Sequence, residues 1–171
     1  LDIDEHNNRV CEIEQKLQEC LREVVKHGVS SSLHGANPDY LYNFVRSILF
    51  GYVIPKIVSR GKRFSEVDYN YINSMYRSAT KDFKLEVKNN NLWVGNYNVG
   101  SVTPDVWRSS GEKLVIDMIF EVLKKFSSDL DDLTEDGHHL IKNSKNIAPR
   151  LKDKLKHAAN AKFLPLTRPC K

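Results

Sequence analysis

The sequence predicts a mainly α-helical fold, namely a bundle of four main helices with a short C-terminal helix and one inserted β-hairpin at about residues 82–99. Apolar residues recur at helical spacing over most of the chain, whereas period-two alternation occurs in one short region. Among 171 residues, Gly (8) and Pro (6) are sparse and 40% are hydrophobic. This composition excludes collagen-like and fully disordered classes and is typical of a single folded domain.

The first predicted helix covers residues 4–27 and ends at Gly28, a residue that commonly terminates helices. Its apolar residues follow a heptad pattern, which is typical of a seam between two helices. The seam has two interpretations: it packs on the rest of the domain, or it binds a partner helix or a second copy of the chain. In the second interpretation, the interacting residues are Val10, Ile13, Leu17 and Val24.

After a loop over residues 29–36, Asn37-Pro38-Asp39 is a helix start, with Asn as the cap and Pro in the first helical position. The following residues leave little polar face, so we expect the central core helix here, with a kink or stop near Pro55. A basic turn, Arg60 to Arg63, precedes a third helix. Ser65 and Asp68 resemble a capping arrangement for that helix, which we expect to end at about Ala79.

The hairpin is predicted from alternation at Phe83, Leu85 and Val87, followed by the asparagine turn 89–91 and a second strand over 92–99. Trp93, Tyr97 and Val99 would share one face of that strand. Because an isolated hairpin is marginally stable in water, this face should be buried. It is expected to pack on the helices of the domain or on a partner, in which case Trp93 and Tyr97 are interaction residues.

Residues 101–111 are predicted to be a loop, and Ser109 with Glu112 resembles a capping box for a fourth helix that ends near Phe126. The apolar pattern fails over residues 127–137, and the last amphipathic segment spans residues 149–161. We therefore expect a helical bundle with a hairpin over residues 1–136, and a basic segment with a short helix over 137–171 that docks on the same domain.

Charge is distributed unevenly, because residues 112–136 sum to −5 and residues 137–171 sum to +8, within a net charge of +4. The basic segment either folds onto the acidic stretch 129–136 or binds an anionic partner. Nucleic acid is one such partner, although no known nucleic-acid-binding motif is present. The residues predicted to contact it are Arg60, Lys62, Arg63, Lys145, Arg150, Lys152, Lys154 and Lys156.

No residue set predicts catalysis, a cofactor or a metal site. Asp105, Asp117 and Lys124 resemble a metal-nuclease motif, but the lysine that such a motif requires would fall at Ile119. A calcium-loop pattern beginning at Asp132 lacks a carboxylate at its twelfth position. The adjacent His138 and His139 would point in different directions and could not chelate one metal together.

Three cysteines, Cys11, Cys20 and Cys170, are too few for a disulfide scaffold and favour a reducing compartment, either cytoplasmic or nuclear. A bridge from Cys170 would instead favour secretion. The chain begins with Leu1, so we expect it to be part of a longer protein or processed at its N-terminus. The longest uncharged apolar stretch is nine residues, so no transmembrane segment is predicted.

These observations predict a non-catalytic helical interaction domain that binds a protein partner or self-associates. One alternative is a nucleic-acid-binding module that uses the basic C-terminal segment. A further alternative is a secreted helical carrier of a lipid or another apolar ligand.

Overall fold

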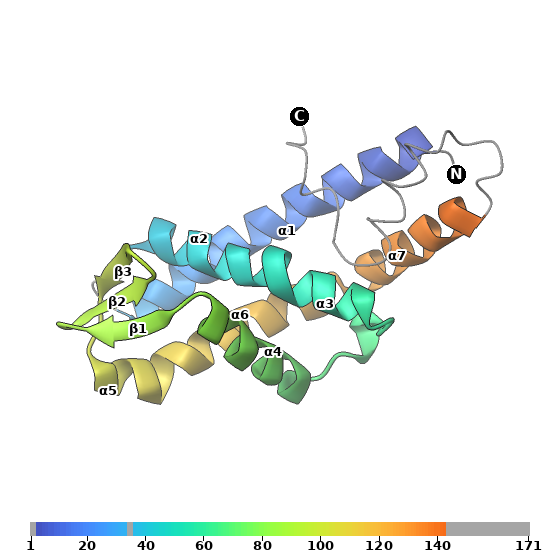
Figure 1. The fold of residues 1–171 in the computed structure, drawn as a ribbon. Helices are drawn as coiled ribbons and strands as arrows, with labels where there is room; N and C mark the ends of the chain where they lie inside the picture. The colour runs from blue at the N-terminus through green and yellow to red at the C-terminus, as the bar shows by residue number, and fades with distance from the viewer. Residues whose placement is uncertain (1–2, 34–35, 143–171) are drawn as a thin grey trace.

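A computed structural model describes residues 3–33 and 36–142 of the chain. The described part is mainly helical, with one small antiparallel sheet at one end of the long helices (Figure 1). The predicted mainly-α class with an inserted β segment is confirmed. The predicted helix at residues 149–161 lies outside the described residues, as does most of the basic segment.

Helix α1 (Ile3–Ser32) is longer than predicted. It packs against α2 (Pro38–Ile48), α6 (Glu112–Lys125) and α7 (Ser127–Lys142). The predicted stop at Gly28 is wrong, and residues 29–32 of the predicted loop 29–36 are helical. A Cβ atom built at Gly28 would lie 2.2 Å from Cε of Met118 on α6, so Gly28 sits where two helices pack closely. Val29 and Leu33 then extend the buried side of the chain beyond this contact.

Residues Pro38–Ser59 form one helix of three parts: α2 (Pro38–Ile48), the π-helical segment η1 (Leu49–Val53) and α3 (Ile54–Ser59). The predicted cap is confirmed, since Asn37 Oδ1 accepts a hydrogen bond from the backbone N–H of Asp39 at 2.9 Å. Pro55 does not end the helix. Since proline lacks an N–H group, the wider turns of η1 just before it accommodate the missing hydrogen bond.

This helix is long and apolar enough, by length and composition, to cross a membrane, because an 18-residue window of it has a mean hydropathy of 1.2. Within the described chain, 61% of that window is buried inside the protein. Such burial is also typical of a core helix. Its fully buried side chains are Leu41, Val45, Ile48, Leu49, Val53, Ile54 and Ile57.

The basic turn Arg60 to Arg63 is the C-terminal cap of α3. Gly61 has φ +69°, and the N–H of Lys62 donates to the carbonyl of Ile57 while that of Gly61 donates to Val58. This pair of bonds is a Schellman motif, which requires a left-handed residue such as glycine. Three basic side chains next to a helix C-terminus also interact favourably with the helix dipole.

After a short 3-10 turn, η2 (Phe64–Glu66), helix α4 (Tyr69–Asp82) begins with Asp68 as its cap. The Asp68 carboxylate accepts from the N–H of Tyr71 at 2.8 Å. The predicted capping role of Ser65 is therefore wrong. Instead, the N–H of Ser65 donates to Asp131 on α7, which holds the turn against that helix.

The sheet has three strands in the order β1 (Leu85–Lys88), β2 (Asn91–Val94) and β3 (Tyr97–Ser101), where the sequence predicted two. The first turn is confirmed, because Asn89 and Asn90 both adopt positive φ. A second turn at Gly95, with φ +59°, divides the predicted second strand. The register of β3 against β2 shifts between Leu92 and Trp93, and Val99 is buried while Tyr97 is 74% exposed, so these two residues do not share a buried face.

The predicted loop 101–111 is mostly helical. Thr103 caps a helix that runs through α5 (Pro104–Val106), the π-helical segment η3 (Trp107–Gly111) and α6 (Glu112–Lys125). The predicted cap at Ser109 is therefore wrong, whereas the helix over 112–125 is confirmed. Residues 127–137 are also helical, in α7 (Ser127–Lys142), because Leu130 and Leu133 at helical spacing are buried against the bundle.

Candidate functional site

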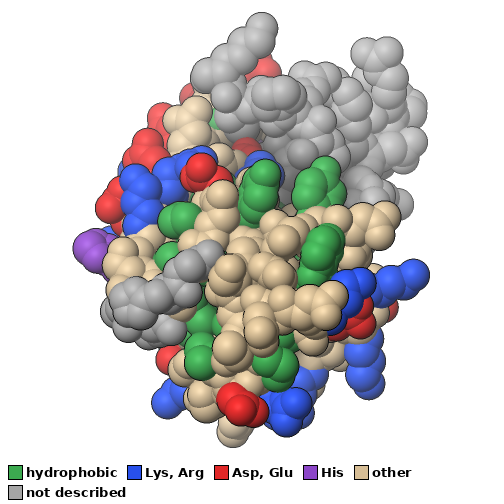
Figure 2. Space-filling model, turned by 90° about the vertical axis from the view of Figure 1, so that its left-hand side faces the viewer, with side chains coloured by type: hydrophobic (Ala, Val, Ile, Leu, Met, Phe, Trp, Pro, Cys, Tyr) green, Lys and Arg blue, Asp and Glu red, His purple; other side chains and the backbone are tan. Residues whose placement is uncertain are grey.

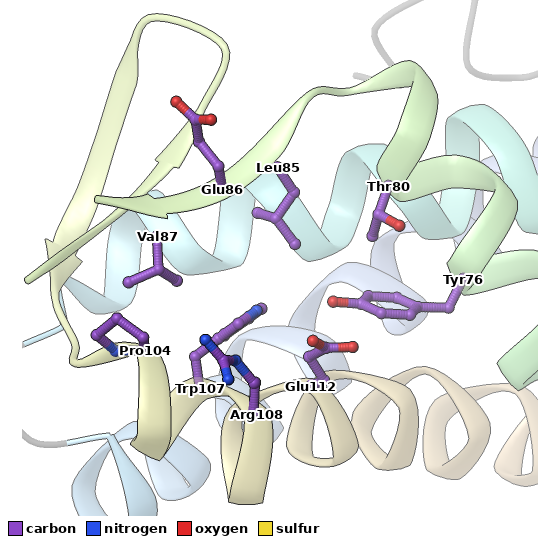
Figure 3. A pocket seen from close by; sticks show the side chains of 9 residues that line it. All are labelled: Tyr76, Thr80, Leu85, Glu86, Val87, Pro104, Trp107, Arg108 and Glu112. Carbon is purple, nitrogen blue, oxygen red and sulfur yellow. The ribbon is translucent and has the colours of Figure 1, made fainter.

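A pocket of about 270 Å³ lies between strand β1 and the helices α4, α5 and α6 (Figure 3). Leu85 and Val87 point into it from the sheet, while the Glu86 side chain points away. Its other lining residues come from α4, α5, η3 and α6: Tyr76, Thr80, Pro104, Trp107, Arg108 and Glu112. The sheet insertion and the π-helical turn η3 thus bring together residues that are more than 30 positions apart in the sequence.

Strand β1 is an edge of the sheet, with β2 on one side. In the hairpin closed by Asn89 and Asn90, Lys88 pairs with Asn91 next to the turn, and hydrogen-bonded pairs then alternate with non-hydrogen-bonded ones. The backbone groups of Leu85 and Val87 therefore point away from β2. Within residues 36–142, no hydrogen bond is recorded for these outward N–H and C=O groups.

The floor of the pocket holds the hydroxyl of Tyr76, which is buried and has no hydrogen-bond partner among the described residues. Burial raises the pKa of this phenol above its ordinary value, and the negative charge of Glu112 raises it further. Glu112 is half-buried and forms no ion pair with the part of the chain that the structure describes. Two polar groups with spare bonding capacity thus face the same space (Figure 3).

Segment η3 positions the wall of this pocket. Trp107 is 5% exposed, and a Cβ atom at Gly111 would lie 2.2 Å from its Cε3 atom. Glycine at position 111 therefore gives the indole room to lie over the helix. The π-helical turn thus contributes Trp107 and Arg108 to the lining of the pocket.

The predicted interaction residues of α1 are largely used within the domain. Leu17 is fully buried and Val10 is 8% exposed, whereas Ile13 and Val24 are half-buried and pack against the core. The heptad pattern thus coincides with the side of α1 that packs on α2, α6 and α7. Val10 and Leu17 therefore pack within the described part of the domain, whereas Ile13 and Val24 remain partly exposed.

The structure separates the two predicted aromatic interaction residues. Tyr97 is exposed, whereas Trp93 is half-buried and lies on the sheet face that carries Lys88, whose Nζ is 5.2 Å from the indole centre. At the end of the molecule that carries the sheet, hydrophobic side chains lie in separate groups, divided by backbone and by side chains that are neither hydrophobic nor charged (Figure 2). Charged side chains gather toward the edges of this view.

The predicted nucleic-acid contacts divide into two sets. In the basic turn, Arg60 is exposed, Lys62 Nζ lies 5.1 Å from the ring centre of Tyr71, and Arg63 Nε lies 3.7 Å from the Asp131 carboxylate. The other five residues lie outside the described residues: Lys145, Arg150, Lys152, Lys154 and Lys156. Part of the acidic stretch has other partners, since Asp136 pairs with Arg9 at 3.0 Å.

Residues considered for metal or catalytic chemistry remain apart. Among the described residues, no group of three or more His, Cys, Asp or Glu side chains could hold a metal ion. Burial raises the pKa of the Tyr69 phenol and the neighbouring Asp117 carboxylate raises it further, while His139 lies 3.8 Å from Glu135 on the exposed side of α7. Cys11 is bonded in a disulfide and Cys20 is a free thiol, while Cys170 lies outside the described residues.

Sequence reasoning missed the pocket because it interpreted residues 101–111 as a loop. The signal was present in Thr103-Pro104-Asp105, a cap followed by proline and an acidic residue, the same pattern that was used at Asn37. A helix predicted from that cap would have placed Trp107, Arg108 and Glu112 on one helical segment.

Comparison with known proteins adds no function, since the chain matches no protein-family model, no curated protein and no solved structure.

Proposed function

We propose that this protein is a non-catalytic interaction domain that binds an extended segment of a protein partner along strand β1. The observation that carries the proposal is the free edge of β1 beside a pocket. The outward backbone groups of Leu85 and Val87 have no recorded partner in the described chain, and the pocket lies directly next to them.

Strand addition follows from the chemistry of an edge. An unpaired strand presents N–H and C=O groups that another extended chain can pair with, and the main-chain bonds supply affinity while pockets select side chains. Residues of an added strand alternate between the two faces of the sheet. Every second side chain would therefore lie on the face of Leu85 and Val87, over the pocket.

This site replaces the α1 seam as the candidate surface for a partner. Self-association by pairing of β1 with β1 of a second copy uses the same edge, and an increase in mass with concentration would reveal it. The strand has four residues, of which two face outward, so we expect affinity to depend on the pocket as well as on the backbone.

The edge can be tested with peptides from a randomised 12-residue display library, selected on the wild-type protein. Val87→Pro removes the outward N–H group, and because proline is tolerated where an edge strand faces away from its neighbour, the sheet should persist. We expect at least about a tenfold loss of affinity for the selected peptides, the equivalent of one or two main-chain hydrogen bonds.

The matched control is Val87→Thr, which keeps a β-branched side chain and the N–H group. It should bind the same peptides within about threefold of wild type. Circular dichroism and thermal melting confirm that both variants fold. Selection of no peptide, or equal binding by Val87→Pro and wild type, would contradict the proposed function.

Nucleic-acid binding remains a second candidate, supported by the exposed Arg60 and by Lys62 over the Tyr71 ring. The helix cap explains the same basic residues without a ligand, which makes this candidate weaker. For the apolar carrier, the pocket offers Arg108, Glu112 and a phenol, groups that suit a polar ligand better than a lipid chain.

A further inference from the structure

We propose that the pocket beside β1 selects a basic side chain, Lys or Arg, of the bound segment. This inference rests on the proposed function, because the segment that pairs with β1 delivers the side chain. The free edge of β1 alone does not determine which class of side chain the pocket would accept.

The Tyr76 hydroxyl and the Glu112 carboxylate in the pocket can both accept a hydrogen bond from a ligand. The Tyr76 hydroxyl belongs to a side chain that is 1% exposed, and it has no partner among the described residues. Tyr76 points along the pocket from α4, and Glu112 rises into it from α6 (Figure 3). An ammonium or guanidinium group placed between them would donate to the phenol oxygen and to the carboxylate.

The charge of the pocket favours a cation in its inner part. Glu112 is half-buried and forms no ion pair within the described chain, whereas Arg108, which also lines the pocket beside Trp107 (Figure 3), is exposed. Solvent screens an exposed charge more strongly than a half-buried one, so the field of Glu112 dominates inside. An acidic side chain from a partner would meet this carboxylate as a like charge and would be disfavoured.

The remaining lining suits the aliphatic part of the same side chains. Leu85 and Val87 face the indole of Trp107 across the pocket. The methylene stems of Lys and Arg pack on such apolar surfaces while their charged ends reach polar groups. A short polar donor, such as a serine hydroxyl, would leave this apolar wall uncovered.

The test uses the same randomised 12-residue library, selected on wild type, on Glu112→Gln and on a matched control, Glu121→Gln. Glu121 lies on the same helix but is exposed and outside the pocket. We expect peptides selected on wild type and on Glu121→Gln to share one basic position. In wild type, replacing that residue by norleucine should weaken binding by about tenfold or more, as expected for a charge-assisted bond.

In Glu112→Gln, the same replacement should change affinity by less than about threefold, because the carboxylate is gone. Tyr76→Phe provides a second variant that keeps the ring and removes the hydroxyl, and it should also reduce the preference. Peptides that depend on the Val87 N–H but carry no basic position would overturn this inference and leave the proposed function standing. If no peptide depends on that N–H group, both fail.

Discussion

Replacing Asp131 with alanine is expected to lower the free energy of unfolding by about 3 kcal/mol. The Asp131 carboxylate is 9% exposed and accepts the backbone N–H groups of Phe64 at 2.6 Å and Ser65 at 3.1 Å. Arg63 lies 3.7 Å from the same carboxylate. Alanine would leave a buried N–H group without an acceptor and would release the turn η2 from α7.

Chemical denaturation monitored by circular dichroism measures this loss. Asp132→Ala is the matched control, because Asp132 is the next residue of the same helix and is exposed; it should change stability by less than about 0.5 kcal/mol. Asp131→Asn keeps one acceptor oxygen and should have an intermediate effect. Equal effects of Asp131→Ala and Asp132→Ala would show that this carboxylate does not anchor the turn.

Replacing Leu17 with alanine is expected to cost about 2 to 5 kcal/mol, because it leaves a cavity in a packed core. Leu17 is fully buried within the domain. If the heptad seam of α1 instead bound a second copy of the chain, the variant would sediment with a lower molecular mass than wild type at high concentration and would keep most of its stability. Denaturation together with sedimentation therefore distinguishes core packing from self-association through the seam.

Lys16→Ala is the control for this position, since Lys16 is the adjacent, exposed residue of the same helix. It should leave both stability and mass unchanged. A folded Leu17→Ala variant with wild-type stability and a smaller mass would contradict our interpretation of α1 as a core helix.

The helices with strong local signals could be predicted from the sequence. Asn37-Pro38-Asp39 combines a cap, a first-turn proline and an acidic residue, and the long apolar helix that follows is confirmed. The asparagine turn of the hairpin is confirmed for a similar reason, because few residues other than glycine and asparagine adopt positive φ readily. In both cases, neighbouring residues determine the structure.

The errors occur where tertiary packing decides. Gly28 has the sequence signature of a helix end, yet α6 packs so closely against it that glycine is needed inside the helix. Helix α7 contains Gly137 and several acidic residues, a poor helical pattern, but Asp131 is used to hold a turn of another element. Rules that consider only neighbouring residues cannot predict such contacts, because the contacting residues are distant in the sequence.

The candidate site could be predicted only in part, because the Thr103 cap is a local signal whereas the meeting of the sheet with the helices depends on tertiary packing. The nearest predicted features were the hairpin and the helix over 112–126, and each contributes some of its residues. The sheet and the helix lie on either side of Trp107, which belongs to η3. Sequence periodicity does not predict this π-helical turn. The Tyr76 hydroxyl is identified as part of a site because it lacks a partner, which is a property of the folded chain.

The most direct test of strand addition at β1 is amide hydrogen exchange with and without a selected peptide, measured by NMR. We predict that the N–H groups of Leu85 and Val87 exchange more slowly in the complex, since they point outward and would become bonded. The N–H of Glu86 faces β2 and should change much less. Unchanged exchange at Leu85 and Val87 in a saturated complex would contradict the account.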